Sequence, residues 1–255
     1  MSVELSEPDT GATKLHFVFP GHLLTADLLS LSSGANTLVY GDANCKHGSM
    51  TVYDMNTHAK RVIQTAPGHL AHVSVDRRGR LIATALDDGH VISVYDAASG
   101  QKKHELLRSF TKPVLINALC FSDDSVFLAC SSDSRTINVY DLRTAKDLSV
   151  RGHVAVGQRY SQLQPQAQPG FALAAFGQMF GSGAQQKRAL LDTSFAFVYS
   201  RGGGTVRARS FHRCSDDRML LLVSDEQTRE LLVFFFDAQL GGECMRVRLL
   251  SSSDC

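Results

Sequence analysis

Hydrophobic and polar residues alternate over short stretches of this chain, a pattern that predicts β-strands rather than helices. Three of these stretches end in the tripeptide Val-Tyr-Asp, at residues 52–54, 94–96 and 139–141. From the first copy to the second the chain advances 42 residues, and from the second to the third it advances 45. A four-stranded unit that recurs every 40–45 residues, roughly, is typical of a β-propeller blade of the WD-repeat kind. The pattern therefore predicts an all-β fold, a WD-repeat-like β-propeller.

A fourth copy of the unit ends at Asp237, after three phenylalanines. Asp237 lies 96 residues beyond Asp141, which is about two periods instead of one. The additional length falls in the least strand-like part of the chain, at about residues 143–191. We therefore expect a polar leader at residues 1–22 and a partial propeller at residues 23–255, with about four recognisable blades and one long insertion.

The composition is that of an ordinary globular protein, since 44% of the 255 residues are hydrophobic and 20% are charged. The 26 Lys and Arg residues nearly balance the 25 Asp and Glu residues, which excludes nucleic-acid binding through a uniformly basic surface. The N-terminus is polar and acidic, unlike a signal peptide. The longest apolar runs have strand length, far short of the roughly 20 residues of a membrane-spanning helix. These features predict a cytosolic protein without a nucleic-acid partner.

No catalytic or metal-binding set of residues emerges from the sequence. The six cysteines form no CxxC pair and bracket no histidine cluster at zinc spacing, so we expect reduced thiols and no metal. There is no Gly-rich phosphate loop, nucleophile elbow or His-x-x-x-His pair. We expect neither a cofactor nor an enzymatic activity.

Two stretches of the chain carry a resemblance to a known family. They are Leu-Ile-Ala-Thr-Ala-Leu-Asp-Asp-Gly-His-Val-Ile-Ser-Val-Tyr-Asp, from residue 81, and the blade-like stretch at residues 116–140, which matches without a gap. The chain resembles the PROPPINs from about residue 28 to residue 250. The resemblance implies a seven-bladed propeller that binds phosphatidylinositol 3-phosphate and the 3,5-bisphosphate in autophagy and endosomal traffic.

The signature of that family is Phe-Arg-Arg-Gly, whose two arginines serve two separate phosphoinositide sites. The aligned residues here are Leu106, Leu107, Arg108 and Ser109, so only the second arginine is present. In the preceding blade the family's polar and cationic positions fall on Leu86, Gly89, His90 and Ser93. Since inositol phosphates need charge-assisted hydrogen bonds, we expect the first site to be degenerate.

The second phosphoinositide site is better preserved. Arg108, Ser131, Ser132 and Thr136 stand where the family places its arginine and hydroxyl groups. Arginine offers a planar fork to phosphate oxygens, and hydroxyls donate to the same group. The alternatives are a Ser-Ser-Asp turn that satisfies backbone groups and an arginine that is a solvated surface charge. His69 stands near a family histidine, and a structural hydrogen bond in a turn is the favoured interpretation for it.

The insertion contains a dense apolar segment. Residues 160–186 include no Asp, Glu, Lys or Arg, and Leu173, Phe176 and Phe180 have the spacing of one helical face. A segment of this kind can fold at a bilayer interface, and the resemblance places it where PROPPINs carry a membrane-inserting loop. The alternative is a disordered loop whose apolar residues cover a blade. The candidate membrane residues are Phe171, Leu173, Phe176, Met179 and Phe180.

These observations predict a phosphoinositide-binding scaffold, cytoplasmic and peripherally associated with preautophagosomal or endosomal membranes, with autophagy-type protein partners. The alternative is a WD-repeat interaction scaffold that has lost lipid binding. The sequence shows about four blades, whereas the family that it resembles has seven. We therefore expect that about three N-terminal blades are missing, either because the sequence is truncated or because a partner completes the ring.

Overall fold

The computed structural model describes residues 2–6, 13–18, 26–41, 48–108, 113–134, 136–143, 194–199, 205–214, 217–226 and 229–247. The candidate membrane residues at 171–180 therefore lie outside the described residues, as does almost all of the predicted insertion. Within the described residues the only helix is the three-residue 3-10 helix η1 (Ala26–Leu28), and the other elements are strands. The predicted all-β fold is confirmed. No described helix has the length and apolar character that would let it cross a membrane.

The strands form four successive groups of four. The first group is β3 (Leu29–Ser32), β4 (Thr37–Gly41), β5 (Ser49–Asp54) and β6 (Lys60–Gln64). The second is β7 (Leu70–Val75), β8 (Leu81–Leu86), β9 (Val91–Asp96) and β10 (Lys102–Leu107). The third is β11 (Ile116–Phe121), β12 (Phe127–Ser132), β13 (Thr136–Asp141) and β14 (Ser194–Tyr199). The fourth is β15 (Val206–Arg213), β16 (Arg218–Asp225), β17 (Glu230–Asp237) and β18 (Gly241–Val247).

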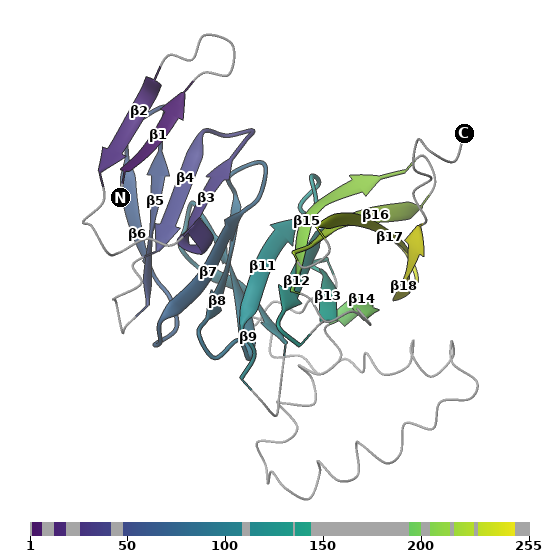
Figure 1. Cartoon of the computed structure of the whole chain (residues 1–255). Helices are drawn as coiled ribbons and strands as arrows, with labels where there is room; N and C mark the ends of the chain where they lie inside the picture. The colour runs from purple at the N-terminus through teal and green to yellow at the C-terminus, as the bar shows by residue number, and fades with distance from the viewer. Residues whose placement is uncertain are drawn as a thin grey trace, which may run out of the picture.

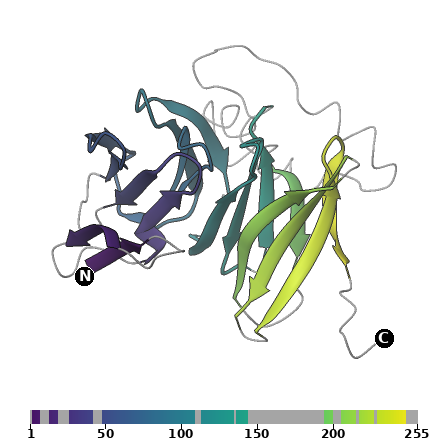
Figure 2. The ribbon, with the colours of Figure 1, turned by 90° about the horizontal axis from the view of Figure 1, so that it is seen from above.

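The groups follow one another across the molecule in chain order (Figure 1). Neighbouring strands within each group are antiparallel, and a parallel pairing of β14 with β18 joins the third and fourth groups into one eight-stranded sheet. The first strands of successive groups contact one another, β3 with β7, β7 with β11 and β11 with β15. Seen from above, the groups lie along an open arc (Figure 2). This arrangement is compatible with about four blades of a propeller.

A separate hairpin precedes the first group. Its strands are β1 (Ser2–Ser6) and β2 (Thr13–Val18), which pair antiparallel to each other. Both strands lie within residues 1–22, where the sequence analysis predicted only a polar leader.

The repeated Val-Tyr-Asp tripeptide is explained by the packing between groups. Val94 packs toward the third group, whereas its neighbour Tyr95 packs on the opposite face, toward the first group. Side chains alternate between the two faces of a strand, so one tripeptide supplies an apolar residue to each interface. The aspartate ends the strand, because Asp96 Oδ1 accepts hydrogen bonds from Ser99 N at 2.7 Å and Ser99 Oγ at 2.8 Å. These bonds hold the pKa of Asp96 below its usual value.

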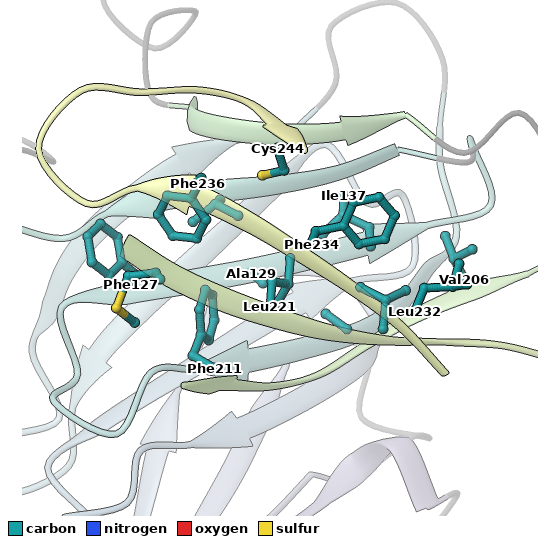
Figure 3. Close-up of a cluster of buried hydrophobic side chains, with 14 of the residues drawn as sticks. Phe127, Ala129, Ile137, Val206, Phe211, Leu221, Leu232, Phe234, Phe236 and Cys244 are labelled. Atoms are coloured by element: carbon teal, nitrogen blue, oxygen red, sulfur yellow. The ribbon is translucent and has the colours of Figure 1, made fainter. Parts of the chain in front are cut away.

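Three apolar cores lie between the four groups, one at each interface. In the core between the third and fourth groups, Phe127 packs edge-to-face on Phe236 with ring centroids 5.4 Å apart (Figure 3). Phe211 completes this aromatic contact at 6.5 Å from Phe127 and 6.3 Å from Phe236. Burial of such large apolar side chains is the main favourable term in folding. The groups therefore stabilise one another through their faces.

Polar contacts also join neighbouring groups. Asp76 is fully buried, and its Oδ1 accepts hydrogen bonds from Arg80 N at 2.6 Å and Leu81 N at 2.9 Å. Its Oδ2 accepts a bond from Ser125 Oγ of the third group at 2.6 Å. A buried carboxylate needs such partners, and here they connect two groups.

A second polar cluster connects η1 with the first strands of the later groups. Arg207 Nη1 on β15 lies 3.1 Å from Asp27 Oδ1 and donates to the backbone oxygen of Asn117 at 2.6 Å. His72 Nε2 on β7 lies 3.8 Å from the same Asp27 oxygen. The pKa of His72 is lowered to about 4, mainly because the side chain is buried. The Asp27 charge opposes this shift, and the Arg207 charge adds to it.

Candidate functional site

The candidate site lies where the end of β10 meets the β12–β13 turn. Arg108 directly follows β10, and its backbone N–H donates to His90 O at 2.8 Å. Tyr140 of β13 donates from its hydroxyl to Leu107 O at 3.1 Å, which holds the end of β10 against the third group. The Arg108 side chain therefore starts from a fixed position and reaches across the interface.

Three hydroxyl groups lie around one nitrogen, Nη2, of the Arg108 guanidinium. Nη2 lies within hydrogen-bond distance of the hydroxyl oxygens of Ser132 and Thr136, and it donates to Ser134 Oγ at 2.6 Å. The hydroxyls also contact one another, since Ser132 Oγ and Ser134 Oγ are 2.7 Å apart and Ser134 Oγ and Thr136 Oγ1 are 3.0 Å apart. Ser132 is buried, Thr136 is half-buried and Ser134 is exposed, so the cluster opens to the surface at the turn.

The charge of Arg108 has no acidic partner among the described residues. No described carboxylate oxygen lies within 4.0 Å of its guanidinium nitrogens. The aspartate of the same turn, Asp133, instead accepts a hydrogen bond from Leu115 N through its Oδ1 at 3.1 Å. Beneath the cluster, burial raises the pKa of the Cys130 thiol to about 12, and the neighbouring Arg108 charge acts in the opposite direction. Arg108 is thus a cation that is paired only with neutral groups in the described structure.

The structure brings together three of the four predicted site residues. Arg108, Ser132 and Thr136 meet as expected, but Ser131 lies on the other face of β12. Ser131 Oγ donates to Ala118 O at 3.5 Å and accepts a bond from Ala208 N of the fourth group at 3.3 Å. Ser131 therefore supports the contact between groups and does not face Arg108.

Ser134 belongs to the cluster, although the sequence analysis did not select it. Ser132 ends β12, Thr136 begins β13 and Ser134 lies in the turn between them, so the hairpin brings the three hydroxyls together. The family pattern directed attention to the adjacent Ser131 and Ser132 instead.

Three positions of the predicted degenerate site are leucines that are buried or half-buried. Leu106 is fully buried in the core between the second and third groups. Leu107 is half-buried, and Leu86 packs against the core between the first and second groups. His69 is in the turn before β7, where its backbone oxygen accepts a bond from Asp87 N at 2.9 Å.

The fold and the surface cluster define a β-propeller protein with a cationic surface site lined by hydroxyl groups. A family model of the PROPPINs matches residues 20–252, and the chain belongs to this family. It is 27% identical to WD repeat domain phosphoinositide-interacting protein 2 of Xenopus laevis over 228 residues, covering 85% of this chain and 48% of that protein. It is 33% identical to autophagy-related protein 18 of Caenorhabditis elegans over 112 residues, which are 44% of this chain and 27% of that protein. The chain spans about half the length of the frog relative.

Solved structures show the same fold. Kluyveromyces lactis Hsv2 superposes with a TM-score of 0.57 at 17% identity, over 94% of this chain and 64% of that one. A structure described as the complex of KlAtg21 with the coiled-coil of AgAtg16 gives a TM-score of 0.59 at 16% identity, over 97% of this chain and 76% of that one. The predicted β-propeller fold and PROPPIN resemblance are confirmed.

Proposed function

We propose that this protein is a non-enzymatic scaffold that binds membranes containing phosphatidylinositol 3-phosphate or the 3,5-bisphosphate. Arg108 holds the phosphate, and the hydroxyls of Ser132, Ser134 and Thr136 donate to its oxygens. The observation that carries this proposal is a guanidinium whose Nη2 contacts three hydroxyls and that has no carboxylate partner among the described residues. Hydrogen bonds of this charge-assisted kind contribute about 1.5–3 kcal/mol each.

A single headgroup site of this strength calls for a second membrane contact. The apolar segment with Phe171, Leu173, Phe176, Met179 and Phe180 is our candidate for that contact, although it lies outside the described residues. Two weak contacts on one body strengthen each other through effective concentration. The names of the relatives, a phosphoinositide-interacting protein and an autophagy-related protein, support a peripheral membrane role in autophagy, and the complex of KlAtg21 with the coiled-coil of AgAtg16 supports autophagy-type protein partners.

One observation favours a second candidate function. The hydroxyls that would receive the phosphate already bond to Arg108, so the arginine also acts as a connection between two groups of strands. A scaffold that has lost lipid binding would keep the arginine for this structural reason.

Liposome sedimentation distinguishes the two functions. Arg108→Ala removes the only charge of the cluster, so we expect about a tenfold or greater loss of binding to vesicles with phosphatidylinositol 3-phosphate. Arg209→Ala is the matched control, because Arg209 is exposed and its Nε donates to Ser224 Oγ at 2.7 Å. If Arg108→Ala leaves lipid binding unchanged but lowers the melting temperature, Arg108 has the structural role and the lipid site is refuted.

A further inference from the structure

The connector between β10 and β11 carries an exposed apolar tip beside the Arg108 cluster. The tip is defined as Pro113, Val114 and Leu115, the three residues directly before β11; Pro113 and Leu115 are exposed and Val114 is buried. Leu115 is 58% exposed, and a few other large apolar side chains among the described residues, such as Leu240, are similarly exposed. Isolated surface leucines are common in soluble proteins, but Leu115 differs in where and how firmly it is held.

Hydrogen bonds fix the tip to turns of both neighbouring groups. On one side, Leu115 N donates to Asp133 Oδ1 at 3.1 Å, and Asp133 N donates to Leu115 O at 3.0 Å. On the other side, Val114 N donates to Asp88 O at 3.1 Å. Gly89 packs so tightly here that a Cβ at its position, where φ is +59°, would lie 1.8 Å from Val114 O. The tip is therefore held in place before any ligand arrives.

The tip and the Arg108 cluster share one end of the strands. Asp133, which binds both backbone groups of Leu115, lies between Ser132 and Ser134 in the chain. Successive turns of antiparallel strands alternate between the two ends of a sheet. The β12–β13 turn and the β10–β11 connector thus lie at one end, and turns such as β17–β18 lie at the other. A cation with neutral partners and a rigid apolar side chain are presented next to each other.

We propose that Leu115 enters the interface of a phospholipid bilayer when Arg108 binds a lipid headgroup. This inference rests on the proposed function, because the headgroup brings the tip to the membrane. The 3-phosphate projects from the inositol ring into the headgroup region of the membrane, so binding it brings the nearby apolar residue to the bilayer surface, where that residue can enter the boundary between headgroups and acyl chains. A rigid tip loses little conformational freedom on insertion. The adjoining cation and hydroxyls favour a lipid over an apolar protein surface as the occupant.

The experiment compares Leu115→Ser with Leu240→Ser in the full chain. Leu240 is a matched control, because it is 63% exposed and lies in the β17–β18 turn at the other end of the strands. One arm measures binding of a soluble, short-chain phosphatidylinositol 3-phosphate. The other arm measures binding to phosphatidylcholine vesicles that contain the long-chain form of the same lipid. We expect Leu115→Ser to bind the soluble lipid like the unaltered protein and the vesicles about tenfold more weakly.

Each other outcome has a defined meaning. Suppose that the unaltered protein binds the soluble lipid. If Leu115→Ser then leaves vesicle binding unchanged, or if Leu240→Ser weakens vesicle binding equally, the insertion of Leu115 is refuted and the proposed function is not. Loss of soluble-lipid binding in Leu115→Ser also refutes the insertion, because Leu115 would then act on the headgroup site. An unaltered protein that binds neither lipid form overturns the proposed function itself. Leu115→Phe provides a second check, since a larger apolar residue should strengthen vesicle binding without changing soluble-lipid binding.

Discussion

At the scale of single residues, Ser131 and Ser132 show how adjacent identical side chains acquire different roles. Both lie in β12, and their side chains point to opposite faces of the sheet. Ser132 faces Arg108, whereas Ser131 bonds to backbone groups of β11 and β15. Ser134 contacts Ser132 from the turn that follows β12. The PROPPIN resemblance pointed to this turn, and the alternation of side chains within β12 separates Ser132, which faces Arg108, from Ser131, which does not.

This separation predicts opposite effects for two alanine variants. Ser134→Ala should weaken binding to vesicles with phosphatidylinositol 3-phosphate about three- to tenfold and leave stability nearly unchanged, because Ser134 is exposed and bonds to Arg108 at 2.6 Å. Ser131→Ala should leave lipid binding unchanged and lower the free energy of unfolding by about 1 kcal/mol, because it removes buried hydrogen bonds. Sedimentation and urea unfolding measure the two effects. The assignment is refuted if Ser131→Ala is the variant that loses lipid.

At the scale of elements, the short helix η1 is connected to β7 and β15 through one buried and two partly buried polar side chains. Asp27 lies close to both His72 and Arg207, and these three residues are up to 180 positions apart in the chain. His72 is buried, so protonation of its imidazole is disfavoured because the charged ring would lose hydration. No local sequence pattern indicates such a contact, because it depends on how separate sheets pack.

The burial of His72 makes stability depend on pH. The pKa of His72 is lowered from 6.5 to about 4 in the folded protein, so between these values the unfolded chain binds a proton that the folded protein does not. Stability should therefore fall as the pH decreases from 6.5 toward 4, by an amount of about 3 kcal/mol from this group. Urea unfolding across this range, in the unaltered protein and in His72→Gln, measures the effect. Equal pH dependence in both proteins would show that His72 is not the responsible group.

At the scale of the whole molecule, the two central groups of strands have an apolar core on each face. The second and third groups share one core, and each has a further core with its other neighbour. The fourth group has a core on one face, whereas Leu231 and Met245 are exposed, at 57% and 62%. Phe235, which stands where the earlier repeats have valine, is half-buried under the Arg218 guanidinium, 6.0 Å from the ring centroid.

Hydrogen exchange should follow this distribution of cores. We expect the amides of β8 and β12 to exchange more slowly than those of β4 and β16, because opening a central strand disrupts packing on both faces. Mass spectrometry of peptides that cover these four strands provides the measurement. Equal protection in all four would mean that the molecule opens only as one unit.

The sequence by itself determined the strands, their period and the position of Arg108. Alternation of side chains and the aspartates that end the strands are local properties, so they can be read along the chain. The repeat length and the PROPPIN resemblance then predicted the fold that the structure confirms. The β1–β2 hairpin and the parallel pairing of β14 with β18 were not predicted from the sequence.

Only the tertiary structure decided which side chains form the candidate site. Arg108 meets Ser132, Ser134 and Thr136 across 24 to 28 residues of chain, because two groups of strands pack face to face. The same packing turned Ser131 away and fixed Leu115 beside the cluster. A sequence pattern specifies which face of its own strand a residue occupies. What lies opposite that face depends on the relative placement of whole sheets, which the non-local cores establish.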